Sequence, residues 1–354
     1  MLPAKASDHS MNESSTSETE RGEGCGTGVL LSRGTQAAAF PASVRDGAGR
    51  RFLGIDTSNY TTSAAVCEED GGISRSIRQL LAVREGECGL RQSDAVFAHT
   101  VNLPGVIAQL GRVIPTAVGV SVTPRDCPGS YMPCFLSGKA AASAVASLLG
   151  VPLYTFSHQR GHLAAALYSC GREDLCDKEF LAFHVSGGTT ELLHVKNREI
   201  QPIGGTADIS AGKAVDRIGV TLGLRFPCGA ELERLAAAAA GNVKPRVSVD
   251  GCRCNFSGLE NLAAELVRKG TPPGEVAAFV LASVGETLVR MTEGALRLYP
   301  GLPVIYAGGV MSNRLIRPAL SGRFDAYFAE PQFSCDNAAG IALLCRRRWE
   351  ETHG

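Results

Sequence analysis

Apolar and polar residues along this chain alternate in blocks that predict short strands and longer helices in turn. Short apolar runs bounded by Gly, Pro, Ser or Asn indicate strands, and stretches with apolar residues three or four positions apart indicate helices. Strands that alternate with helices are typical of a mainly parallel sheet covered by helices on both faces. The strands are expected within 52–66, 118–122, 151–156, 180–195 and 303–309, and the helices at 91–114, 137–149, 209–222, 230–240, 259–269 and 276–298.

One phrase occurs twice, as FLGIDTSNYTT at Phe52–Thr62 and as FLAFHVSGGTT at Phe180–Thr190. Phe, Leu, Ser and two Thr recur in the same order, shifted from 52 to 180, so we expect a duplicated α/β domain whose two lobes face a cleft. Each copy ends in a hairpin tip of small and hydroxyl residues, which is a candidate phosphate cradle because backbone N–H groups can converge there. The alternative is a tip that only closes a hairpin.

The domain organisation follows from the repeat and from a change in composition. Residues 1–50 are rich in Ser, Thr, Glu and Gly and have no sustained apolar period, which predicts a disordered N-terminal extension. The two lobes are expected at 51–178 and 179–354. Hydrophobic residues make up 44% of the chain and charged residues 20%, as in a soluble globular protein.

Charge, hydropathy and cysteine usage exclude several classes of protein. Lys plus Arg and Asp plus Glu are both 35, so no global basic field attracts nucleic acid. No apolar run approaches the roughly 18 residues of a membrane span, and we expect a cytoplasmic protein. The twelve Cys are scattered, many inside apolar runs, which favours reduced thiols over a disulfide framework.

The motif HQRGH at 158–162 is the first candidate for chemistry. It follows the strand ending at Phe156, and the segment HLAAALYS that continues from it has a strong helix propensity. His158 and His162 are therefore expected on one helix face. Two imidazoles in this arrangement can bind one metal ion. The residues between them include no Glu to act as the base of a metalloprotease. The alternative is a pair of ordinary surface histidines.

Asp336 lies at the start of the last apolar helical stretch. A carboxylate there is suited to be the third ligand of a metal held by the two histidines. It is equally suited to cap the N-terminus of that helix.

Two further motifs are candidates for nucleotide binding. Gly308 and Gly309 close a strand and permit close approach of a ligand, and Asn313 at the head of the next helix can bond a nucleoside or ribose. Asp208 and Asp216 are placed to lie near one helix face, where they could address ribose hydroxyls or a magnesium ion. The alternatives are tight strand-to-helix packing and solvated acids, respectively.

Taken in order, these motifs resemble the tRNA threonylcarbamoyladenosine transferase family, formerly labelled O-sialoglycoprotein endopeptidases. The resemblance covers residues 51–345 and implies an actin-like or Hsp70-like fold of two lobes. It also implies transfer of a threonylcarbamoyl group from its adenylate to the N6 amine of the adenosine beside the anticodon. It rests on DTSNYTT, HQRGH, HVSGGTTELLHV, DISAGKAVDRIGVTLGL, FPCGAELERLA, FSGLE, YAGGVMSN and CDNAAGIA.

The resemblance also implies site residues, cofactors and partners. The metal, iron or zinc, is expected on His158, His162 and Asp336, with magnesium accompanying the nucleotide as an open alternative. The partners are expected to be threonylcarbamoyl adenylate or another adenine nucleotide, tRNA, and a smaller homologous protein. No general base is identified. The substrate and nucleotide residues carried over are His184, Val185, Ser186, Gly187, Gly188, Asp216, Gly229 and Asn313.

The chain departs from the family pattern by losing acidic residues. The first loop usually has an internal acidic pair where this chain has Tyr60 and Thr61, and Gly205, Ile209 and Lys213 stand where three acids are expected. Lost acids near a metal or phosphate site change ligand preference. The alternative function is therefore that of a catalytically altered paralogue, which serves as a nucleotide-binding scaffold for partner proteins. A metalloprotease is the least favoured of the three functions.

Overall fold

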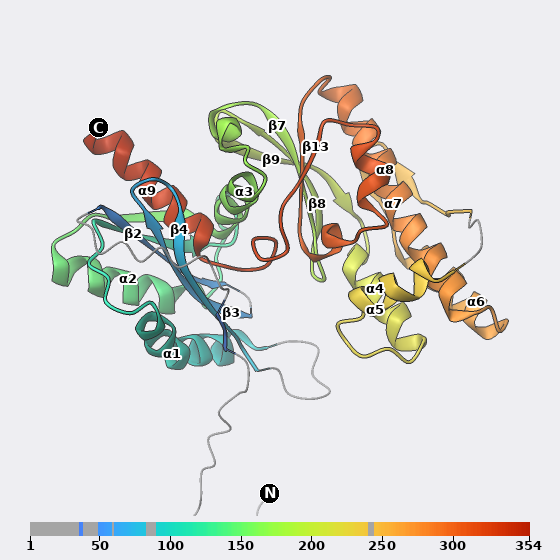
Figure 1. The fold of residues 1–354 in the computed structure, drawn as a ribbon, viewed down its shortest axis with the longest axis horizontal. Helices are drawn as coiled ribbons and strands as arrows, with labels where there is room; N and C mark the ends of the chain where they lie inside the picture. Colours follow the sequence, from blue (N-terminus) through green and yellow to red (C-terminus); the bar gives the residue numbers. More distant parts are fainter. Residues whose placement is uncertain (1–34, 38–48, 59, 83–89, 240–243) are drawn as a thin grey trace, which may run out of the picture. The chain divides into compact units, whose positions relative to one another are not determined.

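The computed structural model describes residues 35–37, 49–58, 60–82, 90–239 and 244–354. The predicted disordered extension lies outside the described residues, except for strand β1 (Thr35–Ala37) and for Gly49 and Arg50. The described strands form two sheets, one from the first half of the chain and one from the second (Figure 1). Among the described residues, no helix is both long and apolar enough to cross a membrane.

The first sheet has the strand order β1-β4-β3-β2-β5-β6. Helices α1 (Gln92–Gln109) and α2 (Phe135–Leu149) pack on one face, where Leu53 and Val66 are buried with them. Helix α9 (Ala339–His353) packs on the other face, against Phe52 and Cys67. Both faces of the sheet are therefore covered. Its remaining strands are β2 (Arg51–Ser58), β3 (Thr61–Glu68), β4 (Ile73–Leu80), β5 (Ala117–Thr123) and β6 (Leu153–Ser157).

The second sheet has the order β10-β11-β9-β8-β7-β12-β13. One face packs against α3 (His158–Ser169), and the other against helices that follow β9. Its strands are β7 (Phe180–Val185), β8 (Thr190–Lys196), β9 (Glu199–Thr206), β10 (Val249–Asp250), β11 (Arg253–Cys254), β12 (Val304–Ala307) and β13 (Ala326–Phe328). Its helices are α4 (Ala211–Thr221), α5 (Gly229–Ala237), α6 (Ser257–Arg268), α7 (Pro273–Leu298) and α8 (Arg317–Ser321), with 3-10 turns η1 (Glu173–Asp177) and η2 (Gly309–Ser312).

The repeated phrase corresponds to a repeat of topology. The order β4-β3-β2-β5-β6 in the first sheet matches β9-β8-β7-β12-β13 in the second. The register is repeated as well, because Phe52 pairs with Cys67 and Phe180 pairs with Val195 at the same offset. The predicted duplicated α/β fold is confirmed.

The prediction of mainly parallel sheets is wrong. β2, β3 and β4 pair antiparallel, as do β7, β8 and β9, whereas β2–β5–β6 and β7–β12–β13 pair parallel. The short connections within each hairpin force antiparallel pairing, and only the later strands are reached through helical crossovers. Each sheet is therefore mixed.

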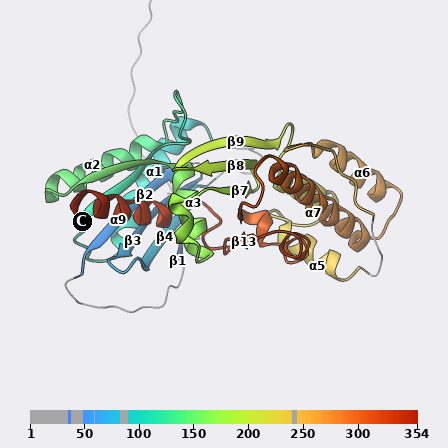
Figure 2. The ribbon, with the colours of Figure 1, turned by 90° about the horizontal axis from the view of Figure 1, so that it is seen from above.

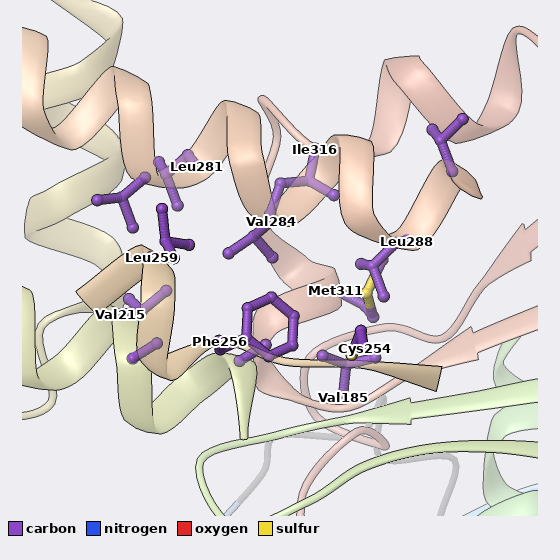
Figure 3. Close-up of a cluster of buried hydrophobic side chains, with 14 of the residues drawn as sticks. Val185, Val215, Cys254, Phe256, Leu259, Leu281, Val284, Leu288, Met311 and Ile316 are labelled. Atoms are coloured by element: carbon purple, nitrogen blue, oxygen red, sulfur yellow. The ribbon is translucent and has the colours of Figure 1, made fainter. Parts of the chain in front are cut away.

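The core of the second lobe forms around α7, which is buried along most of its length. Figure 3 shows Leu281, Val284 and Leu288 of this helix directed toward Phe256 and Met311. The predicted lobe boundary after residue 178 stays a prediction. Helix α9 follows the second sheet in the chain but packs on the first, where Figure 2 shows it beside β2.

Helices α3 and α9 approach each other closely where two glycines meet. A Cβ atom on Gly340 would lie 1.8 Å from the carbonyl oxygen of Gly161, and a Cβ on Gly161 would lie 2.9 Å from Ile341 Cδ1. Gly54 of β2 is similarly tight, since its Cβ would lie 2.5 Å from the backbone nitrogen of Ala342. Gly340 and Gly54 would meet backbone atoms and so exclude any side chain, whereas Gly161 meets the movable end of Ile341. Gly340 and Gly54 therefore set how closely α9 packs.

Gly340→Ala is expected to lower the free energy of unfolding by about 1–3 kcal/mol, because the new methyl group meets backbone rather than a movable side chain. Denaturant unfolding followed by circular dichroism measures the change. The matched control is Gly258→Ala, which also changes the second residue of a helix but has open space around the new methyl group. It should be neutral or stabilising by up to about 1 kcal/mol. An equal decrease in the free energy of unfolding in both variants would contradict the close packing of α9 at Gly340.

Candidate metal centre and nucleotide site

The two histidines of HQRGH lie in the first turns of α3. Strand β6 ends at Ser157, whose hydroxyl accepts a hydrogen bond from Arg160 N and caps the helix. His158 and His162 are one turn apart, with ring centroids 4.2 Å from each other. The predicted placement of both imidazoles on one helix is confirmed.

Asp336 meets both histidines although 174 residues separate it from His162. Its Oδ1 atom lies 3.4 Å from His158 Nε2 and 3.2 Å from His162 Nε2. The N-cap interpretation is wrong, because α9 begins only at Ala339 and it is Asn337 Oδ1 that accepts the hydrogen bond from Ala339 N. The carboxylate of Asp336 therefore contacts both histidines and does not cap α9.

A second carboxylate, Asp56, lies behind His158 and was not predicted as a site residue. Asp56 is fully buried at the end of β2, and its Oδ1 is 3.2 Å from His158 Nδ1. It also accepts hydrogen bonds from the hydroxyls of Ser58, at 2.6 Å, and Ser121. A carboxylate on Nδ1 holds the proton there and leaves Nε2 free to bind a cation. The sequence signal was an acid that follows the apolar run FLGI and opens the motif DTSNYTT.

The electrostatics of this group are those of a buried charge cluster. Burial opposes charge on His158, but Asp56 and Asp336 outweigh it and raise the pKa of the imidazole to about 10. Burial would raise the pKa of Asp336, but hydrogen bonds from His158 and His162 hold it well below its usual range. The carboxylates stay ionised and attract a positive charge to this point.

The donor atoms fit a divalent transition metal. One atom from each of His158, His162 and Asp336 lies within 4.8 Å of the others. The 3.2–3.4 Å separations of nitrogen and oxygen exceed the 2.7–2.9 Å usual for a charge-assisted hydrogen bond. They match the roughly 3.3 Å between two ligands placed tetrahedrally about 2.0–2.1 Å from one ion. Two imidazoles and a carboxylate suit zinc or iron about equally.

His184 extends this cluster from the second sheet. It lies near the end of β7, and its ring centroid is 4.6 Å from that of His162. Burial, reinforced by the neighbouring His162, lowers the pKa of His184 to about 3. The sequence placed this residue in the ligand-binding loop, and the structure shows that it adjoins the imidazoles at the start of that loop.

The tip of the second hairpin is an open turn. Ser186 N donates to Thr189 O at 2.8 Å, and Ser186 Oγ accepts from Thr189 N at 3.2 Å. Ser210, the N-cap of α4, donates its hydroxyl to Gly187 O at 2.6 Å and so holds the helix start against the tip. No heavy atom of the described chain lies within 4 Å of a Cβ built on Gly187 or Gly188. The tip can therefore be approached by a ligand.

Gly308, which was predicted to permit close approach of a ligand, adjoins the end of β7 before this tip. Gly308 has φ 103°, and a Cβ there would lie 2.2 Å from Val185 O, so the turn presses on the end of β7. Asn313 does not head a long helix as expected. It follows the 3-10 turn η2, and its Oδ1 accepts hydrogen bonds from the backbone N–H groups of Leu315 and Ile316.

The predicted acids on α4 serve backbone groups. Asp216 Oδ1 accepts from Cys228 N at 2.8 Å, which joins α4 to the start of α5 beside Gly229. Asp208 precedes α4 and accepts from Phe256 N and Ser257 N, both at 2.9 Å. The expectation of one shared helix face is wrong for Asp208, and its engaged carboxylate argues against a magnesium site there.

The described residues of the first hairpin tip differ from those of the second. Asn59 at its turn lies outside the described residues, so the predicted cradle there stays a prediction. Thr57 and Ser58 are fully buried. The Thr57 hydroxyl donates to Cys134 O at 3.0 Å, and the Ser58 hydroxyl donates to Asp56. The repeated residues Ser58 and Ser186 therefore differ in their contacts. The Ser58 hydroxyl donates to Asp56 behind His158, and the Ser186 hydroxyl accepts from Thr189 N within the open turn.

The missing family acids have different surroundings. Gly205 has φ +150°, and a Cβ there would lie 2.6 Å from Thr190 O, so this backbone has no room for an acid. Thr61 is buried in β3, whereas Tyr60 is 42% exposed. Lys213 lies exposed in the first turn of α4, next to the second hairpin tip. A positive charge replaces an expected negative one at the side where an anion would arrive.

Comparison with known proteins gives one family. Residues 95–343 match the family described as tRNA N6-adenosine threonylcarbamoyltransferase. The protein of that name from Syntrophobacter fumaroxidans is 30% identical over 328 residues, covering 85% of this chain and 95% of the relative. The protein of that name from Halalkalibacterium halodurans is 33% identical over 325 residues, covering 85% of this chain and 91% of the relative.

Solved structures with similar folds are more distant in sequence. HypF from T. kodakarensis is similar with a TM-score of 0.57 and 13% identity, covering 86% of this chain and 48% of that chain. The activator of 2-hydroxyisocaproyl-CoA dehydratase from Clostridium difficile, with bound ADPNP, has a TM-score of 0.53 and 13% identity, covering 85% and 96%. These likenesses support the actin-like fold. The match over residues 95–343 and the full-length relatives together show that this chain belongs to the tRNA N6-adenosine threonylcarbamoyltransferase family.

Proposed function

We propose that this protein transfers a threonylcarbamoyl group from threonylcarbamoyl adenylate to the N6 amine of the adenosine beside the anticodon of tRNA. We further propose that it does so with one iron or zinc ion held by His158, His162 and Asp336. Family membership supports the class of reaction. The observation that supports the metal is the convergence of these three side chains from α3 and from the segment before α9, with 3.2–3.4 Å between the donor atoms.

Asp56 and the helix cap position the donors before any ligand arrives. The Asp56 carboxylate fixes which nitrogen of His158 carries the proton, and Ser157 fixes the start of α3. Both groups are buried, so neither depends on a mobile surface loop. Preorganised polar groups of this kind stabilise developing charge without a cost of reorganisation.

The second hairpin tip is proposed to hold the adenylate. Its Gly187 and Gly188 are open to a ligand, and α4 begins beside them. Backbone N–H groups and the N-terminus of a helix attract phosphate. They would therefore stabilise AMP as the leaving group when the threonylcarbamoyl group is transferred to the N6 amine. Asn313, Asp216 and Gly229 remain candidates for contacts with the nucleoside. A bound divalent ion would contribute Lewis acidity at the acyl carbonyl.

Variants of the histidines test this proposal. His158→Ala is expected to lower bound iron or zinc well below the content of the unaltered protein and to slow threonylcarbamoyl transfer to tRNA by about 100-fold or more. Elemental analysis and a transfer assay with threonylcarbamoyl adenylate, unmodified tRNA and the partner proteins measure both. His353→Ala, at the exposed end of α9, is the control and should change neither. Nucleotide binding without any transfer by the unaltered protein would support the scaffold alternative instead.

Metal affinity should depend on pH with a definite sign. The pKa of His158 is raised to about 10, so the metal-free protein carries a proton there at pH 7 that a metal ion must displace. Affinity should therefore rise about tenfold per pH unit between pH 7 and 9, as measured by competition with a coloured chelator. Asp56→Asn removes a carboxylate that raises this pKa, so the slope should be shallower. A flat profile in the unaltered protein would contradict the assignment.

We also propose that a smaller homologous protein binds the first lobe on α1 and α2. These adjacent helices leave large apolar side chains in solvent, with Phe97 71% and Val101 59% exposed on α1, and Leu136 48% and Leu148 87% exposed on α2. Large apolar side chains exposed on two helices that contact each other support an interaction surface there.

Phe97→Glu is expected to weaken this association by at least about tenfold, because a charge would be buried at the centre of the contact. Size-exclusion chromatography of the two purified proteins measures complex formation, and the metal content of the variant should be unchanged. Unaltered association would place the partner elsewhere.

A further inference from the structure

A groove of about 760 Å³ lies on the opposite side of α3 from the histidine pair. Its walls are α3, strand β6, the β8–β9 hairpin and the last turns of α9. None of the metal or nucleotide residues assigned above lines it. Its size is within the range of functional binding sites.

One wall of the groove is an open strand edge. β6 ends the strand order of the first sheet and pairs only with β5 among the described strands. Val118 N donates to Pro152 O, and in a parallel pair the next groups directed at β5 are then those of Tyr154 and Phe156. The N–H and C=O groups of Leu153 and Thr155 therefore point away from β5, and both residues line the groove.

The residues of β6 offer little protection against pairing, although the β5–β6 ladder has a register shift between Ser121 and Thr123. Natural sheets blunt exposed edges with Lys, Pro, bulges or a covering segment. β6 has the sequence LYTFS, which carries neither charge nor proline, and Thr155 at its centre is exposed. Such an edge is a template for one more strand.

The floor of the groove is apolar. Phe180, Val195 and Ile200 are cross-strand neighbours on one face of the second sheet, and all three line the groove. Leu163 and Leu167 of α3 extend this surface. Phe180, Val195 and Leu167 are buried, so the part of this floor that an added strand could cover is the partly exposed surface of Ile200 and Leu163.

The rim is basic. Arg198, Arg347 and Arg348 share the carboxylates of Asp177 and Glu351, so three guanidinium groups meet two carboxylates. Arginine forks bind carboxylates bidentately, and an additional acidic side chain would complete this network.

We propose that this groove binds an extended segment of a partner protein, which adds as a strand to β6. Its alternate apolar side chains cover the floor, and an acidic residue meets the arginines of the rim. The outward N–H and C=O groups of Leu153 and Thr155 favour a polypeptide over a small amphipathic molecule, because a second backbone presents partners to them in sequence.

A peptide selection with a proline variant tests the proposal. A phage library of random peptides of about twelve residues is selected on the full chain, and the enriched peptides are synthesised and titrated by fluorescence polarisation. Thr155→Pro removes an outward N–H group while sparing the pairing with β5, and should weaken binding by about tenfold or more. Thr155→Val keeps the N–H group and should bind as the unaltered protein does. Enriched peptides should alternate apolar residues and carry an acid.

Amide hydrogen exchange on the unaltered protein gives an independent result even if the proline variant fails to fold. The amides of Leu153 and Thr155 should exchange fast in the free protein and slow at least about tenfold with peptide bound, whereas those of Tyr154 and Phe156 are protected throughout. No enrichment, or binding that leaves Leu153 and Thr155 unprotected, would overturn the proposal. The proposal would also be overturned if the free protein formed a dimer that Thr155→Pro disrupts and the peptide displaces. A second copy of this chain would then be the occupant of the groove.

Discussion

Among the described glycines, Gly340 is the one whose added Cβ would lie nearest another atom, the carbonyl oxygen of Gly161 where α3 and α9 cross, and the candidate site depends on this crossing. The backbones of the two helices are in contact there, which fixes the position of α9 against α3 and the first sheet. Asp336 lies just before α9, and His158 and His162 flank Gly161. The contact that fixes two helices therefore also brings a carboxylate from the end of the chain to two imidazoles from its middle. A glycine between two metal-binding histidines is explained by packing, although the chemistry needs only the spacing.

Electrostatics then determine what the converged side chains can do. Asp56 and Asp336 flank His158 in a buried environment and hold it charged in the absence of a cation. An unpaired buried charge is costly, so this arrangement is stable only as an ion cluster or with a metal in place of the protons. The pairing of Asp56 with Nδ1 favours the second outcome, because it directs Nε2 toward Asp336. The open hairpin tip and the start of α4 belong to the same second lobe that contributes His184 to this cluster.

Much of this could be predicted from sequence, and the failures have physical reasons. Periodicity located most helices, and the repeated phrase predicted the duplicated fold, because each copy performs the same structural task at the end of a strand. The mainly parallel sheet was a wrong prediction because the alternation of strands and helices was applied to the whole chain, although the two predicted hairpins required antiparallel neighbours. At the first tip the repeated residue Ser58 turns inward and donates to Asp56, whereas its counterpart Ser186 accepts from Thr189 N within the second tip, a difference that identical residues could not reveal. Asp56 was missed since an acid in an apolar run gives no spacing signal, and the open edge of β6 depends on topology that no local pattern contains.

Anomalous X-ray diffraction from crystals of the purified protein, collected on both sides of the iron and zinc absorption edges, tests the metal site most directly. We expect one strong anomalous peak about 2.0–2.2 Å from His158 Nε2, His162 Nε2 and a carboxylate oxygen of Asp336. A protein that contains stoichiometric metal with its peak elsewhere, or with these three side chains turned apart, would contradict this assignment.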